Sequence, residues 1–164
     1  MALTAADVLI ETMAAGLPYA IAAQVAYPER QVVAFVGDGG FSMLMAEIAA
    51  CVKYQLPVKV VIVKNNTLGQ IKWEQIVFLG NPEYGCELQP MDFALFARAC
   101  GAAGFTIENP ADCGRMLEEA LRTPGPVVVQ GVVDPKFAKS LLRGEPNSQK
   151  IALTVLGDRI RELV

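Results

Sequence analysis

Apolar runs alternate with amphipathic stretches along this chain. Continuous runs rich in β-branched residues predict strands at 31–36, 58–63 and 126–133, and a weaker fourth strand is expected at 105–108. Strands that are apolar on both sides are typical of a parallel sheet that is covered on both faces.

Helical periodicity separates the expected strands. Pro110 and Asp112 suit a first helical turn, while Gly101 and Gly104 suit the end of a helix. Strand and helix therefore alternate, which predicts an α/β fold: a doubly wound, mainly parallel sheet with helices on both faces. The expected helices are 17–26, 42–54, 91–100, 111–121 and 151–163.

Two segments, 65–85 and 134–150, are rich in Gly, Pro, Asn and charged residues and are expected to be loops. They could carry functional residues or be ordinary surface connections, and both interpretations stay open.

Size and composition favour one domain that needs a partner. A chain of 164 residues suits a single domain over 1–164. Hydrophobic residues make up 53% of it and charged residues only 19%, with a mean hydropathy of +0.36. We therefore expect part of its apolar surface to be covered by self-association or by another protein.

Several function classes are disfavoured. The apolar stretches 14–27 and 58–63 are too short to span a membrane. No basic residue precedes Arg30, so a signal peptide is not expected. We therefore expect a cytoplasmic location. A net charge of −3 without a basic block gives no reason to expect nucleic-acid binding.

The four cysteines show no C-x-x-C spacing of a metal site. They are expected to be reduced, with several buried as small apolar residues. The chain has no His, which removes the commonest zinc ligand and any Ser-His-Asp or Cys-His catalytic group within it. Chemistry here must rely on carboxylates, amides, a metal or a cofactor. The cysteines are Cys51, Cys86, Cys100 and Cys113.

The first motif is Gly-Asp-Gly-Gly-Phe-Ser at 37–42, between a predicted strand and a helix expected to start near Ser42. Backbone N–H groups at Gly39 and Gly40 could approach a phosphate closely, and the helix dipole would favour it. Asp38 would repel that phosphate unless a cation lay between them. Walker and dinucleotide fingerprints both fit poorly, and the motif alone could be a purely structural turn.

The second motif, Lys-Asn-Asn-Thr-Leu-Gly at 64–69, follows the next predicted strand. The carboxyl ends of parallel strands meet at one edge, where ligands bind, so this turn is expected beside Asp38. A carboxylate, an amide oxygen, a backbone carbonyl, two diphosphate oxygens and a water would give Mg²⁺ the six oxygens it prefers.

This pair of motifs, G-D-G followed by N-N after a little under thirty residues, resembles the signature of thiamine-diphosphate enzymes. From 12 to 129 the chain is similar to the C-terminal, diphosphate-binding domain of the pyruvate oxidase, acetohydroxyacid synthase and 2-oxo-acid decarboxylase superfamily. The runs 71–75 and 81–85 most resemble pyruvate oxidases or quinone-linked pyruvate dehydrogenases.

The resemblance implies thiamine diphosphate and Mg²⁺ as cofactors. Asp38, Asn65 and the backbone carbonyl of Thr67 match the metal ligands, with Asn66 as the alternative to Asn65. Met13 matches a backbone contact to the aminopyrimidine ring. The implied cofactor contacts are Met13, Gly37, Asp38, Gly39, Gly40, Phe41, Ser42, Asn65, Thr67, Leu68 and Gly69.

In the resembled family, the activating Glu lies on a pyrimidine-binding domain of the neighbouring subunit, and no stretch here resembles that domain. The resemblance thus implies a chain with no catalytic residue of its own, a 2-oxo acid as substrate, a homo-oligomer, and room for FAD in the full enzyme. Two alternatives remain open: a non-catalytic binding or assembly domain, and a generic nucleotide-binding α/β domain, which has no use for Asn65 and Asn66.

Other conspicuous residues have structural interpretations. Trp73 could line a substrate channel or serve as a packing anchor. Glu47 is expected on a helix surface or behind the site rather than as an acid-base catalyst. Helical spacing places four further residues in the core: Met43, Leu44, Ile48 and Val52.

Overall fold

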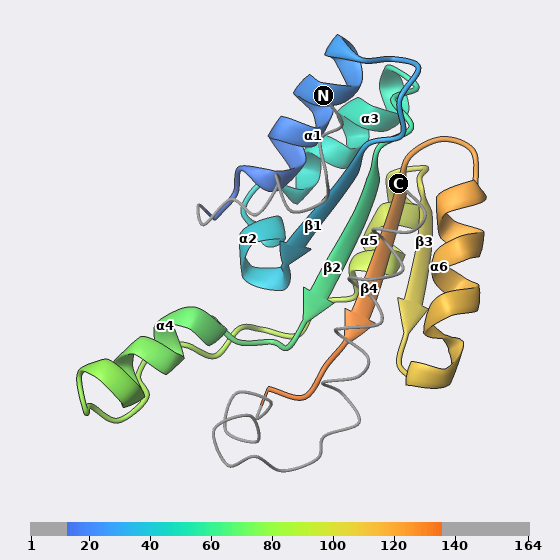
Figure 1. Cartoon of the computed structure of the whole chain (residues 1–164). Coiled ribbons are helices and arrows are strands. Elements are labelled where there is room, and N and C mark those ends of the chain that lie inside the picture. Colours follow the sequence, from blue (N-terminus) through green and yellow to red (C-terminus); the bar gives the residue numbers. More distant parts are fainter. Residues whose placement is uncertain (1–12, 136–164) are drawn as a thin grey trace.

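The computed structural model describes residues 13–135, which form a four-stranded parallel sheet with helices on both faces (Figure 1). The expected helix 151–163 and most of the expected loop 134–150 lie outside the described residues. The α/β prediction is confirmed. Among residues 13–135, no helix combines the length and apolar character needed to cross a bilayer.

The strands lie in the order β1-β2-β4-β3, so consecutive strands connect through helices. All pairings are parallel, with Phe35, Val61, Val129 and Phe105 in one register row across the sheet. The predicted strands are confirmed to within two residues at each end. Their bounds are β1 Val33–Gly37, β2 Lys59–Lys64, β3 Ala103–Ile107 and β4 Val127–Val132.

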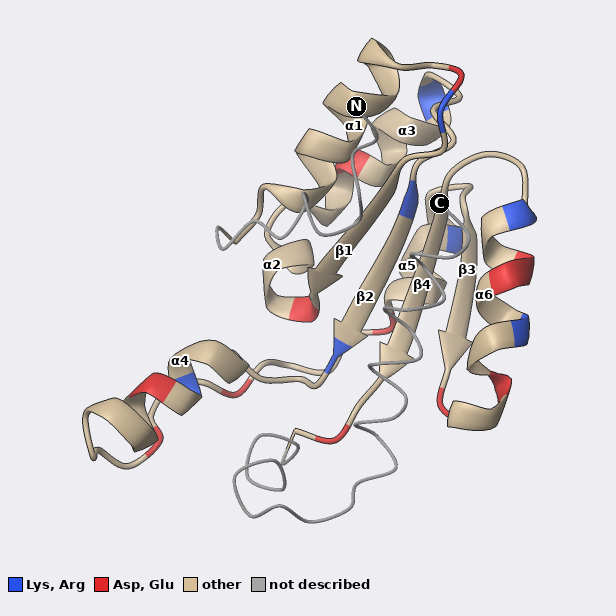
Figure 2. Ribbon diagram, viewed as in Figure 1, with Lys and Arg blue, Asp and Glu red and all other residues tan. Residues whose placement is uncertain are grey.

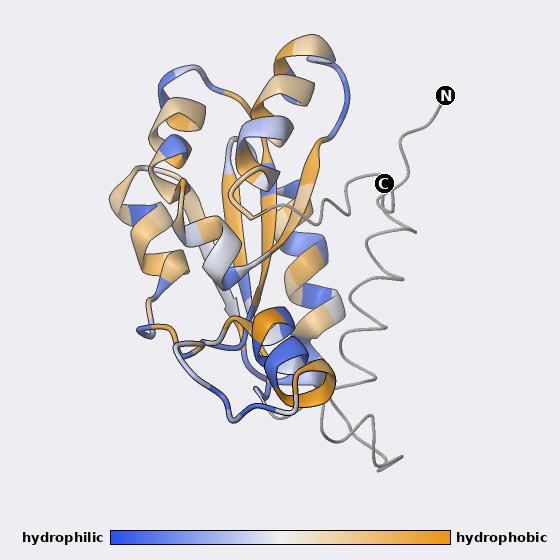
Figure 3. Cartoon of the chain, turned by 90° about the vertical axis from the view of Figure 1, so that its left-hand side faces the viewer, coloured by the Kyte–Doolittle hydropathy of each residue, from blue (hydrophilic) through white to orange (hydrophobic). Residues whose placement is uncertain are grey.

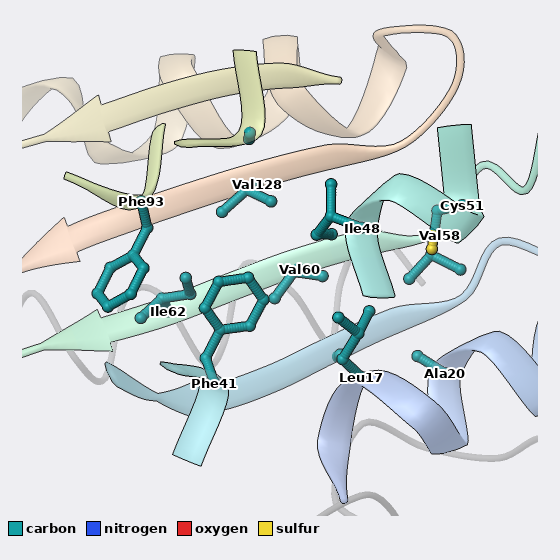
Figure 4. Packing of buried hydrophobic residues seen from close by; sticks show 12 residues of the cluster. Leu17, Ala20, Phe41, Ile48, Cys51, Val58, Val60, Ile62, Phe93 and Val128 are labelled. Atoms are coloured by element: carbon teal, nitrogen blue, oxygen red, sulfur yellow. The ribbon is translucent and has the colours of Figure 1, made fainter. Parts of the chain in front are cut away.

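Four helices contribute to the larger hydrophobic cluster on one face of the sheet (Figure 4). Leu17 and Ile48 pack there against Val60, and all three side chains are almost completely buried. These helices are α1 Gly16–Ala26, α2 Asp38–Ser42, α3 Ile48–Lys53 and α5 Phe93–Ala99.

The opposite face carries a smaller cluster under α6, Cys113–Arg122, which follows a short 3-10 helix, Pro110–Asp112. Leu117 of α6 is fully buried against this face. Pro110 in the first turn agrees with the sequence prediction. Within the described residues, helices thus cover both faces, with four on one side and one on the other, and Figure 1 shows their arrangement around the sheet.

The single helix predicted at 42–54 is wrong in its start and its continuity. Helix α2 already begins at Asp38 and ends at Ser42, and a 3-10 helix, Met45–Glu47, precedes α3. The Ser42 hydroxyl donates to the Gly39 carbonyl at 2.9 Å, a local bond that competes with helix continuation.

This break changes which residues reach the core. Met43 and Leu44, predicted to be buried, are 59% and 40% exposed because they lie at the break between the helices. Ile48 is buried and Val52 half-buried, as predicted, while Glu47 is exposed.

The segment 65–85, predicted as a loop, contains helical structure. Helix α4, Gly69–Trp73, continues into a π-helical turn, Glu74–Phe78. Flanking Gly, Pro and Asn residues dominated the sequence signal, although 70–78 consists largely of residues that tolerate a helix. Trp73 packs edge-to-face on Phe78, with ring centroids 5.0 Å apart.

The two glycines expected to end a helix behave differently. Gly101 follows α5 with φ +90°, as a terminating glycine should. Gly104 instead lies inside β3, so that prediction was wrong. A Cβ there would collide with the Ala94 backbone of α5, so Gly104 permits close helix–strand packing.

Candidate functional site

The carboxyl ends of β1 and β2 lie side by side, with Gly37 opposite Val63 in the parallel register. Asp38 and Asn65 follow these strands and therefore meet at the same edge of the sheet. Asp38 is 4% exposed, which is unusual for an acidic side chain.

The Asp38 carboxylate accepts hydrogen bonds from three backbone N–H groups. Oδ1 accepts from Gly39 at 2.9 Å, and Oδ2 accepts from Asn65 at 3.0 Å and Asn66 at 2.6 Å. None of the ion pairs among residues 13–135 includes Asp38. Its two oxygens offer about four acceptor directions, so the buried charge keeps capacity for a cation.

The adjacent asparagines have different surroundings. Asn65 lines the cavity at this edge, and its Oδ1 accepts from the Thr67 N–H at 3.0 Å. Asn66 does not line the cavity; its φ is +54° and its carbonyl accepts from Leu88 N–H at 2.9 Å. The geometry favours Asn65 as a ligand and gives Asn66 a role in the turn.

A cavity of about 390 Å³ lies in front of these residues. It brings together every residue predicted to contact a cofactor except Ser42, whose hydroxyl is directed to the Gly39 carbonyl. The lining residues are Met13, Ala14, Gly16, Leu17, Phe35, Val36, Gly37, Asp38, Gly39, Gly40, Phe41, Val63, Asn65, Thr67, Leu68, Gly69, Gln70 and Ile71.

The glycines keep this cavity open. A Cβ on Gly39 would come within 2.7 Å of Leu68 Cδ2 and 3.2 Å of Leu88 Cδ1. Because α2 begins at Asp38, both glycines lie in its first turn, where N–H groups lack helical acceptors. The Gly39 N–H donates to Asp38 Oδ1 instead. The positive end of the helix therefore lies at the glycines and not, as predicted, near Ser42.

Sequence reasoning missed Ala14, which lines the cavity next to Met13 with φ +74°. A non-glycine residue rarely adopts this conformation, and such strain concentrates at functional sites. The Ala14 backbone N would lie 3.7 Å from a Cβ on Gly40, so this turn closes over the glycines. No residue-type signal in the sequence marks an alanine in this conformation.

The chemistry of the donor set suits a hard cation held by few charges. Among residues 13–135, no three acidic, Cys or His side chains gather as a metal cluster. A metal at Asp38 would therefore rely on one carboxylate, neutral amide and carbonyl oxygens, and anionic oxygens of a ligand, which suits Mg²⁺ with a diphosphate.

Comparison with known sequences decides the family. The profile of the family described as "Thiamine pyrophosphate enzyme, C-terminal TPP binding domain" matches residues 3–130. The chain belongs to this family. The superfamily predicted from the sequence is confirmed, and the domain assignment supports thiamine diphosphate as the cofactor.

Relatives of this TPP-binding domain are much longer proteins. A putative thiamine pyrophosphate-containing protein, YdaP, of Bacillus subtilis is 38% identical over 94% of this chain and 29% of its own length. The acetolactate synthase large subunit of Pyropia yezoensis is 35% identical over 87% of this chain and 25% of its own. The sulfoacetaldehyde acetyltransferase of Castellaniella defragrans is 38% identical over 63% of this chain and 17% of its own length. A closer relation to pyruvate oxidases stays a prediction.

In this TPP-binding domain, residues 69–85 form an arm that extends from the cavity edge (Figure 1). Its base is tied by an antiparallel bridge between Thr67 and Glu87, and by the Leu68 N–H donating to the Cys86 carbonyl at 2.8 Å. Further along the arm, whose charged residues are coloured in Figure 2, Lys72 pairs with Glu83 at 2.6 Å.

The arm lies beside the cavity, which Gln70 and Ile71 line, and exposes apolar side chains. Figure 3 colours hydrophobic residues of the arm orange. Phe78 is 68% exposed although it contacts Trp73, which supports the packing interpretation of Trp73. Other large apolar side chains exposed on the arm are Ile71, Ile76, Val77, Leu79 and Tyr84.

The cysteines lie outside the cavity lining and are free thiols, as expected. Burial raises the pKa of the Cys51 thiol to about 11 and also raises that of Cys113. Because a raised pKa keeps a thiol protonated, these two buried side chains are apolar core residues and not nucleophiles.

Proposed function

We propose that this domain binds the diphosphate of thiamine diphosphate through Mg²⁺, as part of an enzyme that decarboxylates or oxidises a pyruvate-type 2-oxo acid. One observation carries the proposal: the buried Asp38 carboxylate, without a cationic partner among the described residues, lies beside Asn65 at a glycine-lined cavity.

Three oxygens of this chain would hold the metal: a carboxylate oxygen of Asp38, Oδ1 of Asn65 and the backbone carbonyl of Thr67. Asn65 Oδ1 already accepts from Thr67, and the Thr67 carbonyl accepts from Gly69 N–H at 2.9 Å. Each oxygen has a second lone pair, so these bonds orient the ligands without consuming them.

Gly39 and Gly40 would receive the diphosphate, because neither has a Cβ to block approach and the first turn of α2 presents the Gly40 backbone N–H. The Gly39 N–H already donates to Asp38 Oδ1. Met13, which also lines the cavity, would contact the ring portion of the cofactor. Thiamine diphosphate, when bound, supplies the electron sink that cleavage beside a carbonyl group requires.

Relatives named acetolactate synthase and sulfoacetaldehyde acetyltransferase support an enzyme of this cofactor class. The runs 71–75 and 81–85 favour the pyruvate oxidase type, in which the full enzyme would also carry FAD. Exposed apolar residues on the arm favour a homo-oligomer or contact with another domain.

A second domain is needed for turnover. Asp38 is the only acidic residue that lines the cavity within 13–135, and its carboxylate would be committed to the metal. The chain spans 29% and 25% of the YdaP and Pyropia relatives. We therefore place the activating Glu on a pyrimidine-binding domain outside this chain.

The binding proposal is tested by calorimetry of thiamine diphosphate with and without Mg²⁺. Wild type is expected to need Mg²⁺ for tight binding, and Asp38→Ala is expected to lose that dependence. Asp112→Ala is the matched control, because Asp112 is an exposed partner of Arg115 on the opposite face. Equal affinity in every case would contradict the metal-bridged site.

The division of labour is tested by pyruvate decarboxylation. The chain saturated with thiamine diphosphate and Mg²⁺ is expected to turn over negligibly, and addition of a pyrimidine-binding domain should raise the rate. Acid-base help of this kind is worth about 10²–10⁴-fold. Turnover of about 1–10³ per second by the chain alone would place the acid within these residues.

A further inference from the structure

Gln130 of β4 is a buried polar residue whose side-chain oxygen and nitrogen both have hydrogen-bond partners. It is 3% exposed, on the sheet face that α5 covers. Its Oε1 accepts from the Phe93 N–H at 3.0 Å, while its Nε2 donates to Asp92 Oδ1 and to Thr106 Oγ1, both at 2.9 Å.

These bonds fix the beginning of α5. Phe93 is the first residue of the helix, so its N–H has no acceptor within the helix and uses Gln130 instead. Asp92, the N-cap, also accepts from the Leu95 N–H at 2.8 Å. Since buried polar groups that lose a partner are costly, Gln130 leaves α5 little freedom to shift along the sheet.

Phe93 connects this network to the cofactor cavity. Its ring meets the Phe41 ring edge-to-face, with centroids 5.4 Å apart and an interplanar angle of 85° (Figure 4). Both rings are 2% exposed. Phe41 directly follows Gly39 and Gly40 in α2 and lines the cavity with them, so the position of Phe93 limits the position of the glycine turn.

We propose that Gln130 is a positioning residue for the diphosphate site, acting through the Phe93–Phe41 contact on the backbone of Gly39 and Gly40. This inference rests on the proposed diphosphate site. Gln130 itself is not among the residues that line the cavity.

Gln130→Met tests the proposal, because Met keeps the volume and removes all three hydrogen bonds. Gln24→Met is the matched control. Gln24 is another buried glutamine, 1% exposed, whose Nε2 donates to the Arg30 carbonyl at 3.1 Å near the amino edge of the sheet. Both variants should lower the melting temperature, so every measurement is made where both are folded.

Thiamine diphosphate with Mg²⁺ is the probe for calorimetry. Gln130→Met should weaken its affinity by about 10-fold, a typical effect of removing a residue that orients a ligand-binding group, and Gln24→Met should leave it unchanged. In ¹⁵N NMR of the ligand-free chain, the Gly39 and Gly40 amides should shift in the first variant only. Equal affinity losses in both variants, or none in either, would overturn the proposal.

A charge exchange provides rescue. Gln130→Glu keeps the acceptor for Phe93 but sets a second carboxylate against Asp92, and adding Asp92→Asn should restore affinity because the amide can donate across the pair and still cap α5. If Gln130→Met fails to fold, Thr106→Val removes a single partner and should give a smaller effect in the same direction. The positioning role of Gln130 would be contradicted if the double variant did not regain affinity, or if the Gly39 and Gly40 amides did not shift in Thr106→Val.

Failure of the proposed function looks different. If the wild type binds no thiamine diphosphate, the proposed cofactor site is refuted. The NMR shifts of the Gly39 and Gly40 amides then still test whether Gln130 positions the glycines. Shifts in Gln130→Met alone would support the positioning role, and unchanged amides would refute it.

Discussion

Two charged side chains are buried to the same extent at opposite ends of the sheet. Asp38 at the carboxyl edge and Lys59 at the amino edge are each 4% exposed. Lys59 Nζ donates to the carbonyls of Thr123 and Gly125 at 2.5 and 2.6 Å. Both residues lie in the connection between α6 and β4. Burial lowers the pKa of Lys59.

Both charges are satisfied by the backbone, but only one has room beside it. The carbonyls that Lys59 binds lie at and just beyond the C-terminal end of α6, where a cation is favoured. Asp38 lies next to Gly39 in front of a cavity and can accept more bonds. Burial of a charge therefore does not mark a ligand site by itself; spare bonding capacity beside open space does.

Exchanging the two charges for neutral side chains should separate stability from binding. Lys59→Met should lower the free energy of unfolding by about 3 kcal/mol, because two carbonyls lose a charged donor, and leave thiamine diphosphate affinity unchanged. Asp38→Asn should weaken affinity by about 100-fold, or roughly 2.7 kcal/mol, with a smaller loss of stability. Urea unfolding and calorimetry measure both. Similar affinity losses in the two variants would remove the distinction.

Within the carboxyl edge, the two asparagines sharpen the comparison. Asn65→Ala should weaken Mg²⁺-dependent binding by roughly 10-fold or more, since ligand groups and the residues that orient them typically contribute that much. Asn66→Gly should leave binding within about 2-fold and preserve stability, because glycine readily adopts the φ of +54° found there. The reverse order of affinities in calorimetry would make Asn66 the ligand.

A methyl group distinguishes a cavity glycine from an ordinary one. In Gly39→Ala the clashing atoms are flexible ends of Leu68 and Leu88, so the fold should persist while affinity falls by about 5-fold, or roughly 1 kcal/mol. Gly114→Ala, with open space in α6, should raise the free energy of unfolding by about 0.5–1 kcal/mol. Thermal melts with and without ligand test this. Unchanged affinity in Gly39→Ala would argue against close approach of the diphosphate.

The smallest effect concerns a buried group that must stay neutral. Burial raises the Cys51 pKa from 9.0 to about 11, so its contribution to stability is complete below pH 9 and is lost as pH rises from 9 to 11. The stability difference between wild type and Cys51→Ala should shrink by about 1 kcal/mol between about pH 8 and pH 10. Parallel urea titrations at these two pH values would show this, and a constant difference would contradict it.

The sequence predicted what depends on local pattern and on sheet direction. Apolar β-branched runs identified the strands, and the meeting of parallel strand ends placed Asp38 beside Asn65. It did not predict the break after Ser42, because that depends on one hydroxyl bonding to the Gly39 carbonyl. It also missed the φ of Ala14, which only the surrounding packing imposes.

Contacts between distant segments were the least accessible. Gln130 bonds to Phe93 across 37 positions, and no periodicity in either segment announces the partner. Asn65 and Asn66 are adjacent and chemically identical, and the sequence favoured Asn65 only through the family motif. The turn geometry places Asn65 at the cavity and Asn66 outside it.

The strand order β1-β2-β4-β3 also bears on the sequence of folding events. β1 meets β2 at Val33 and Lys59, 59 − 33 = 26 positions apart, whereas β2 meets β4 at Lys59 and Val127, 127 − 59 = 68 positions apart. Closing the longer loop costs more chain entropy and slows pairing. β3 and β4 meet at Ala103 and Val127, only 127 − 103 = 24 positions apart. We therefore expect β1 to pair with β2, and β3 with β4, before β2 joins β4, so that Asp38 and Asn65 come together before the sheet is complete and the metal-binding edge is an early product of folding.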